Sequence, residues 1–324
     1  MLSERRTTSL QATTMRDFAS CFPDVSCSAA GVIGGSFAVV HTSVYKSILS
    51  TRKEVHVKIS WSKPHTITTT GGSSTIAAAV ASPPSSQLAV AIEDGISSRR
   101  SSKPNETQIL YKRKGSRSFV TENSVVGLYW DISGAKYGSG PEPVKDFYVA
   151  VIVDGEFSLL LGDMSRDFVK FFESAIPVAK FSLLTRKEQV RGATSYSTTS
   201  RFRSDGKEHE ISIRCKGDEM DCKDSELSVS IDKKKVVHVR RLKWNFRGNQ
   251  TIFIDGSVVD MMWDVHDWWF ANPAAAGCAL FMFKTRVTAE TRLWLEDELA
   301  RHGQGKSGFF LLIQAFKKQL GNGR

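Results

Sequence analysis

Asp264, His266 and Asp267, within the segment WDVHDWW, are the residues whose types and spacing could perform acid–base or metal chemistry. Asp264 and His266 are two positions apart, so both side chains would emerge on one face of a strand. Such a pair could act as a general acid and base or supply two metal ligands, which makes an uncharacterised hydrolase or metal-dependent enzyme one hypothesis. No third ligand or nucleophile has a recognisable spacing. We therefore favour a structural role at a strand end, with no metal, no cofactor and no catalysis.

Basic residues provide a second candidate site. Leu242, Trp244 and Phe246 share one parity of a predicted strand, and basic side chains occupy the other parity along the same stretch. These anion-binding candidates are Lys233, Lys235, Arg241, Lys243 and Arg247. On a regular strand they would form a positive sheet face suited to nucleic acid, a phosphoinositide membrane surface or an acidic protein. Lysines on an edge strand also protect a sheet from aggregation, and that alternative stays open.

Two other features could bind ligands. The loop SGAKYGSGPEP (133–143) has the glycines and lysine of a phosphate-binding loop, but no GK[ST] sequence follows it, so we predict a rigid turn. No serine lies in a GxSxG context. The seven tryptophans would suit a carbohydrate or small-ligand binding β-sandwich if some of them line an exposed face. Tryptophans at alternating positions more often fill a core.

The composition indicates a globular protein with a basic excess. Apolar residues make up 41% of the 324 residues, and 44 Lys+Arg against 34 Asp+Glu give a net charge of +10, which favours anionic partners. No apolar run approaches the roughly 18 residues of a transmembrane helix. The cysteines lack CxxC spacing, so we expect reduced thiols at Cys21, Cys27, Cys215, Cys222 and Cys278.

The N-terminus bears on where the protein is found. Residues 1–14 are rich in Ser, Thr and Arg, as the start of an organellar transit peptide would be. Met15 could instead be the older start of the protein, preceded by a disordered extension, and we favour this interpretation. Together with reduced thiols it predicts a cytoplasmic or nuclear protein.

The elements that must position the candidate residues are strands. Over Leu227–Phe270 apolar residues recur at every second position, which predicts a β-meander. Asp255-Gly256 and Asp154-Gly155 each predict a type I′ hairpin turn. Two later strands, Cys278–Phe283 and Phe309–Phe316, are apolar at both parities, as strands covered on both faces are. We expect the core to contain Trp130, Trp244 and Trp263, surrounded by Leu128, Leu242 and Phe246.

Helices are few. Ser165–Ala175 is predicted as one, with Asp163 or Ser165 as its N-cap, and Thr288–His302 as the other. We predict a disordered N-terminal segment over 1–30 and a single mostly-β domain over 31–324. Low-complexity insertions at 64–87 and 97–108 interrupt that domain.

The sequence also contains an internal similarity. LYWDI (128–132) and LKWNF (242–246) are each followed by a strand that closes on Asp-Gly, at 154–155 and 255–256. The intervening loops differ in length, so the pattern is not a solenoid period. This similarity could reflect duplication, or merely the repeated use of residues that favour hairpin turns, and we favour the second explanation.

Several long blocks resemble a known family. They are MRDFASCF (15–22), LYWDISGAKYGSGPEPVKDFYVAV (128–151), LLLGDM (159–164), RRLKWNFRGNQTIFIDG (240–256) and WDVHDWWF (263–270). These blocks are similar to those of plant domain-of-unknown-function family 868, and the resemblance runs from Met15 to about Lys318. It implies a plant source and a mostly-β single module, and it brings no activity, ligand or catalytic residue.

We therefore expect a mainly β protein, an antiparallel sandwich or open barrel of β-hairpins and meanders with one or two short helices. Its function is predicted to be non-enzymatic binding or scaffolding, with a basic β-sheet face for anionic partners. The Asp264/His266 enzyme and the carbohydrate-binding sandwich are the alternatives.

Overall fold

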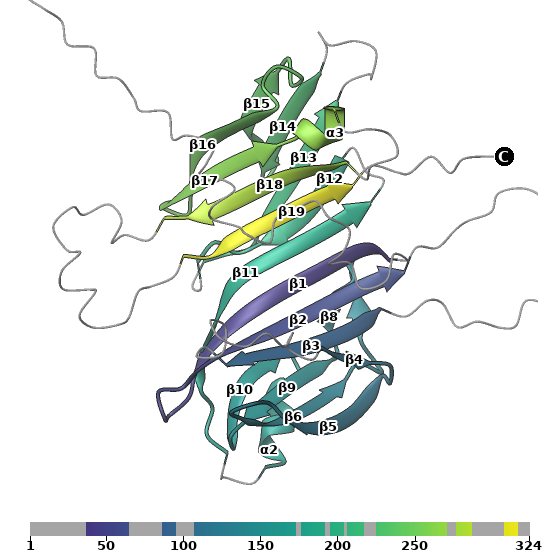
Figure 1. Ribbon diagram of the computed structural model, residues 1–324, viewed down its shortest axis with the longest axis vertical. Coiled ribbons are helices and arrows are strands. Elements are labelled where there is room, and N and C mark those ends of the chain that lie inside the picture. Colours follow the sequence, from purple (N-terminus) through teal and green to yellow (C-terminus); the bar gives the residue numbers. More distant parts are fainter. Residues whose placement is uncertain are drawn as a thin grey trace, which may run out of the picture. The chain divides into compact units, whose positions relative to one another are not determined.

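The computed structural model describes residues 37–64, 86–94, 107–172, 176–191, 195–203, 206–216, 225–270, 277–286 and 308–316. All of them belong to one compact unit, Ser36–Arg324. Their strands form one nine-stranded sheet, two four-stranded sheets and one two-stranded sheet (Figure 1). The fold class is thus confirmed as mainly β and largely antiparallel with short helices, and the described strands close no barrel.

The nine-stranded sheet contains strands from both ends of the chain. Across the sheet the order is β16 (Arg247–Ile254), β17 (Ser257–Asp264), β18 (Cys278–Thr285), β19 (Phe310–Phe316), β11 (Lys180–Arg191), β1 (Phe37–Ile48), β2 (Glu54–Pro64), β3 (Gln87–Asp94) and β4 (Gln108–Leu110). Neighbouring strands pair antiparallel except β11 and β19, which pair parallel. The sheet therefore joins two antiparallel runs at β11.

Two smaller sheets accompany it. One has the order β10 (Glu156–Leu161), β9 (Tyr148–Val153), β6 (Val125–Asp131) and β5 (Lys114–Val120), and the other β12 (Ser195–Ser200), β13 (His209–Lys216), β14 (Glu226–Ile231) and β15 (Lys234–Arg240). The short strands β7 (Lys136–Tyr137) and β8 (Pro143–Lys145) pair with each other. Among the described residues the helices are α2 (Ser165–Lys170) and α3 (His266–Phe270).

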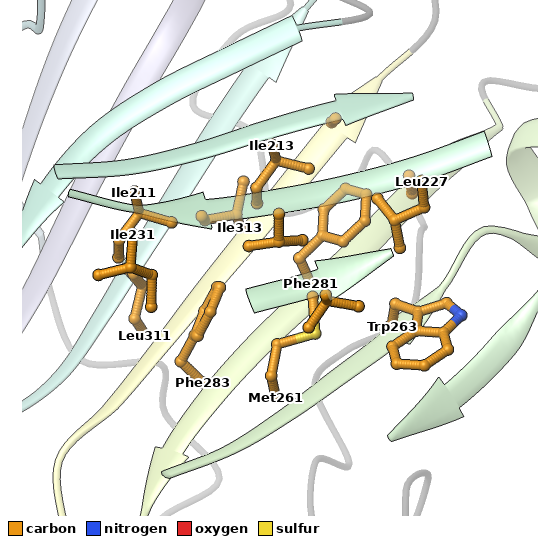
Figure 2. Packing of buried hydrophobic residues seen from close by; sticks show 14 of the residues in the cluster. Ile211, Ile213, Leu227, Ile231, Met261, Trp263, Phe281, Phe283, Leu311 and Ile313 are labelled. Carbon is orange, nitrogen blue, oxygen red and sulfur yellow. The ribbon is translucent and has the colours of Figure 1, made fainter. Parts of the chain in front are cut away.

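Two hydrophobic cores lie on the nine-stranded sheet. In the first core, Val57, Ile59 and Trp61 of β2 pack with residues of β6 and β9 such as Leu128 and Val151. In the second core, residues of β13 and β14 pack with residues of β17, β18 and β19 (Figure 2). The alternation of side chains along a strand explains both cores, because every second side chain enters the layer between two sheets.

β18 and β19 are buried on both faces, as predicted. Leu280 and Met282 are as fully buried as Phe281 and Phe283, which lie on the opposite face of β18. Such strands lack the alternation of polar residues that marks one solvated face.

Two predicted local structures are wrong. No strand runs over Leu242–Phe246, because the chain makes a turn there between β15 and β16. Helix α2 ends at Lys170, and its N-cap is Met164, without a side-chain cap. The carboxylate of Asp163, one of the predicted caps, accepts the backbone N–H of Phe147 instead.

Other predictions fall wholly or partly outside the described residues. The helix predicted over Thr288–His302 lies outside them, as does the N-terminal segment 1–30. Of the two predicted insertions, only the ends are described. Pro64 closes β2, Gln87 opens β3 and Gln108 opens β4.

The cysteines differ from the expectation of reduced thiols. Cys215 is free, and burial raises the pKa of its thiol to about 12, which makes it a poor nucleophile. Cys278, at the start of β18, is disulfide-bonded, so the prediction is wrong for this residue. The thiol argument for a cytoplasmic or nuclear location loses its support there.

The internal similarity is a structural repeat of two hairpins. Gly115 of β5 pairs with Trp130 of β6, and Gly248 of β16 pairs with Trp263 of β17. Each tryptophan lies over its glycine. Each also donates its indole N–H to the backbone carbonyl three residues before that glycine, Trp130 to Lys112 at 2.8 Å and Trp263 to Asn245 at 3.0 Å. The equivalent segments are therefore LYWDI (128–132) and MMWDV (261–265), and the predicted match of LYWDI with LKWNF is wrong.

The polar residues beside these tryptophans repeat as well. Lys114 pairs with Asp131 in the first hairpin, and Arg247 pairs with Asp264 in the second, both at 2.8 Å. The other oxygen of each aspartate accepts a backbone N–H two residues later, from Ser133 and from His266, both at 3.0 Å. So many shared contacts at matching positions favour duplication over recurring turn chemistry.

His209 joins two hairpin turns from different sheets. Its Nδ1 lies 2.8 Å from Asp232 in the β14–β15 turn, and its Nε2 lies 2.8 Å from Asp255 in the β16–β17 turn. Both aspartates have positive φ, as the first residue of a type I′ turn does. Although burial opposes the charged form of His209, its hydrogen bonds to both carboxylates raise its pKa. The contact with His209 in turn lowers the pKa of Asp232 and of Asp255.

Replacing Gly248 with Ala should destabilise the protein by about 1–3 kcal/mol, as overpacking of a core does. A Cβ at this position would lie 2.2 Å from Cζ2 of Trp263, whose ring is buried and cannot move aside. Gly134→Ala is the matched control, because its nearest atom would be 3.8 Å away. Urea unfolding of both variants measures the difference, and equal midpoints would contradict the close ring–backbone contact.

Replacing His209 with Gln should remove a pH-dependent part of the stability. The raised pKa of His209 means that its contribution is complete below about pH 6.5 and disappears as pH rises through the folded pKa. Because the pKa values of Asp232 and Asp255 are lowered, the contribution of these two aspartates to stability is lost only as pH falls below about 4. The difference in melting temperature between the two proteins should therefore be largest near pH 5 and smaller at pH 9. A difference in melting temperature that stays constant with pH would contradict ion pairing of His209 with Asp232 and Asp255.

Candidate functional site

Asp264, His266 and Asp267 lie at the end of β17 and the start of α3. One oxygen of Asp264 pairs with Arg247, and the other accepts the backbone N–H of His266. The ring of His266 contacts Asp267 through Nδ1 at 2.9 Å. Asp264 and Asp267 thus bond to groups within the strand end and the start of α3, and whether the three residues have a catalytic role stays a prediction.

The basic candidates fall into two separate groups. Lys233 lies in the β14–β15 turn and Lys235 follows at the start of β15, and both are exposed. Arg241, Lys243 and Arg247 lie at the other end of β15, about 20 Å away at the rise of an extended strand. The single-strand arrangement predicted for these five residues is wrong, because the chain leaves the sheet at Arg241. Their ability to bind anions stays a prediction.

The turn after β15 reverses the expected burial of Trp244. Arg241 has a φ of 53°, and its carbonyl accepts the backbone N–H groups of Trp244 and Asn245 at 2.9 and 3.1 Å. In such a helical turn, residues two apart point in nearly opposite directions. Leu242 is therefore fully buried, whereas Trp244 is 79% exposed. The prediction of a buried Trp244 is wrong, and those of Trp130 and Trp263 hold, since both are buried.

The turn is anchored on several sides. The N–H of Leu242 donates to Ser225 at 3.0 Å, and the Asn245 amide donates to the carbonyl of Arg240 at 2.9 Å. The carbonyl of Asn245 accepts the indole N–H of the buried Trp263. Trp244 thus projects from a turn that is bonded to the body of the protein on both sides of it.

Aromatic and basic side chains gather beside this turn. Phe246 contacts the rings of His266 and Phe270, with centroids 5.2 and 5.7 Å apart, and the guanidinium of Arg247 lies 5.5 Å from the Phe246 centroid. We call Arg241, Lys243, Trp244, Phe246, Arg247, His266 and Phe270 the second-half corner. It presents positive charge beside exposed π surfaces, a combination that suits phosphate and a planar ring.

A buried polar network lies on β1 and β11, in the middle of the nine-stranded sheet. Its members, which we call the polar seam, are His41, Glu142, Arg186, Glu188, Tyr196 and Thr198. Arg186 donates to Glu142 at 2.6 Å, to His41 at 3.2 Å and to Glu188. Glu188, whose side chain is fully buried, also accepts hydrogen bonds from the hydroxyls of Tyr196 and Thr198.

The seam lies between the two cores on the same face of the sheet. On one side, His41 lies opposite Trp61, which belongs to the first core. On the other side, His41 lies opposite Glu188. Two residues beyond Glu188, and so on the same face, Val190 belongs to the second core. The 133–143 loop covers His41 from above, since a Cβ at Gly140 would lie 3.0 Å from its ring. The turn predicted there holds Glu142 against the seam.

Charge pairing keeps the carboxylates of the seam ionised. Burial alone would raise the pKa of Glu142, but the contacts with His41 and Arg186 outweigh it and lower that pKa to about 2. The pKa of Glu188 is lowered as well, because the charges of His41 and Arg186 and the hydroxyl of Tyr196 outweigh its burial. Burial and Glu188 together raise the pKa of Tyr196. Each charged group already has partners, so we interpret the seam as structural.

The composition and geometry of the described residues bear on metal ions and on membranes. No three His, Cys, Asp or Glu side chains there are grouped so that they could hold a metal ion. Within the same ranges, no helix has the length and apolar character needed to span a membrane.

Comparison with known proteins gives a family and no activity. The model of a family described as "Plant protein of unknown function (DUF868)" matches residues 36–317, in agreement with the resemblance of the sequence blocks. No curated protein and no solved structure matches the chain.

Replacing Arg186 with Met should destabilise the protein by about 3–5 kcal/mol, because it leaves the buried carboxylate of Glu188 without its charged partner. Lys180→Met, at an exposed position of the same strand, should change the free energy of unfolding by less than about 0.5 kcal/mol. Chemical denaturation at neutral pH measures both. If the two variants were equally stable, the seam would contribute nothing to the fold.

Proposed function

Because the chain belongs to a plant family of unknown function, which supplies no activity or ligand, we propose from geometry that it is a non-enzymatic binding protein for single-stranded nucleic acid in the cytoplasm or nucleus. The second-half corner is the binding site. The observation that carries the proposal is the 79% exposure of Trp244 on an anchored turn, closely following Arg241 and Lys243 in the chain.

The chemistry of the corner fits unpaired nucleotides. A base stacks on an exposed indole with a gain of about 1–3 kcal/mol, whatever its identity. Arg241 and Lys243 supply cations for the phosphates on either side of a stacked base. Base-paired nucleic acid fits less well, because its bases are covered, and the helices of the described residues are only six and five residues long, too short to read a groove.

Other ligands match only part of the corner. A membrane surface would favour a broad apolar face, whereas the exposed rings of the corner, Trp244 and Phe270, lie beside charged side chains. An acidic protein needs the cations but not a stacking surface. A neutral carbohydrate would stack on Trp244, as a carbohydrate-binding sandwich would require, but gains nothing from the three basic residues.

Trp244→Ala should weaken the binding of a fluorescent oligouridylate about 5- to 150-fold, the equivalent of 1–3 kcal/mol of stacking. Arg241→Gln/Lys243→Gln should lower the slope of log K against log salt by about 1.4, for two lost phosphate contacts. Both variants should keep the wild-type free energy of unfolding within about 1 kcal/mol, since these side chains lie outside the core. Fluorescence anisotropy over a salt series measures both effects.

Two matched controls accompany these variants. Phe171→Ala removes another ring, 82% exposed, and Lys145→Gln/Lys180→Gln removes two exposed charges elsewhere. Neither should change binding by more than twofold. Equal losses in all four variants would indicate non-specific attraction to a basic protein. Retention by phosphoinositide vesicles or by a neutral glycan, with no oligouridylate binding, would overturn the proposal in favour of those ligands.

A further inference from the structure

The structural repeat places Tyr111 at the position of Trp244. Each residue comes four positions before the glycine that lies under a buried tryptophan, Tyr111 before Gly115 and Trp244 before Gly248. Tyr111 is 83% exposed, close to the 79% of Trp244. An exposed aromatic ring thus occurs at the same point of both halves.

The surroundings of Tyr111 match those of Trp244 in anchoring, and basic residues lie beside both rings, although at different positions of the repeat. Lys112 and Arg113 follow it directly, and both are exposed. The carbonyl of Lys112 accepts the indole N–H of Trp130, and that of Arg113 accepts the N–H of Ile132 at 2.7 Å. These bonds reproduce those of Asn245 with Trp263 and of Phe246 with Val265. We call Tyr111, Lys112 and Arg113 the first-half corner.

Packing does not explain the two exposed rings. The other positions shared by the repeats have structural roles, since the glycines admit the indoles and the aspartates bind a cation and a backbone N–H. Tyr111 and Trp244 bury little of their surface, so they add little hydrophobic stabilisation. A ring retained in both halves at a solvent-facing position between anchored backbone groups is better suited to an external ligand.

The two corners lie at opposite edges of the nine-stranded sheet. Tyr111 directly follows β4 at one edge, and the second-half corner leads into β16 at the other (Figure 1). Nine strands at about 4.8 Å spacing give a width of roughly 40 Å between the edges. A short ligand therefore meets the corners one at a time, whereas a long strand can reach both.

We propose that the first-half corner is a second site for single-stranded nucleic acid, so that one chain holds two segments of a strand. This inference rests on the function proposed for the second-half corner. Tyr111 stacks on a base, and Lys112 and Arg113 contact the flanking phosphates. A strand long enough to span the sheet gains avidity, because its second contact is intramolecular.

The test is a titration with an oligouridylate of about 8 nucleotides, within the range of known single-strand sites. Wild-type protein should bind two molecules per chain, Tyr111→Ala and Trp244→Ala one each, and the double variant none. Tyr111→Phe, which keeps a ring, should retain both sites. With an oligouridylate of about 40 nucleotides, each single Ala variant should lose at least tenfold in affinity. Near-UV circular dichroism checks that the variants fold, and Phe171→Ala is the control for an exposed ring.

The outcomes separate the two claims. If one oligouridylate molecule binds per chain, and this binding is lost in Trp244→Ala but unchanged in Tyr111→Ala, the second site is overturned and the proposed function stays intact. Binding that is insensitive to Trp244→Ala but lost in Tyr111→Ala overturns the proposed function of the second-half corner. Binding by phosphoinositide vesicles alone overturns both.

Discussion

The hydrogen bond from the indole nitrogen of Trp263 to the carbonyl of Asn245 ties the second core to the surface, and the rest of the candidate site depends on it. Trp263 can lie where it does because Gly248 opposite has no side chain. The carbonyl that it binds directly follows Trp244, so a buried ring fixes the backbone that presents an exposed one. The hairpin with Trp130 and Gly115 repeats the arrangement, which makes this contact a property of the fold rather than of one turn.

Much of the fold could be predicted from the sequence because its causes are local. Alternation of apolar residues predicted strands such as β14 and β17, and Asp154-Gly155 and Asp255-Gly256 do form turns with positive φ. The same rule failed at Leu242–Phe246, where apolar residues continue to alternate after the backbone has left the sheet. The positive φ of Arg241 causes that departure, and arginine is not a residue type that predicts it. Only packing in three dimensions distinguishes Trp244 from Trp263.

The polar seam could not be predicted, because its members come from distant parts of the chain. Arg186 and His41 are 145 residues apart, and Glu142 comes from a loop that the sequence marked only as a rigid turn. Alternating charges in TRKEQVR (185–191) are typical of a solvated strand, and nothing local indicates that Glu188 is fully buried. Its burial becomes favourable only when the guanidinium of Arg186 on β11 and the hydroxyls of Tyr196 and Thr198 on β12 come to the same place.

The seam explains why one sheet carries two cores instead of one. Hydrophobic packing is non-directional, so a continuous apolar layer would place little restraint on how each smaller sheet lies over the large one. Charged hydrogen bonds have preferred directions, and an unpaired member would leave a buried charge uncompensated, so the seam admits few alternative arrangements. Tyr196 on β12 and Glu142 beside β8 bring contacts from both halves into it. The seam therefore restrains how the two smaller sheets lie over the large one, whereas the nine-stranded sheet itself sets the distance between the two aromatic corners at its opposite edges.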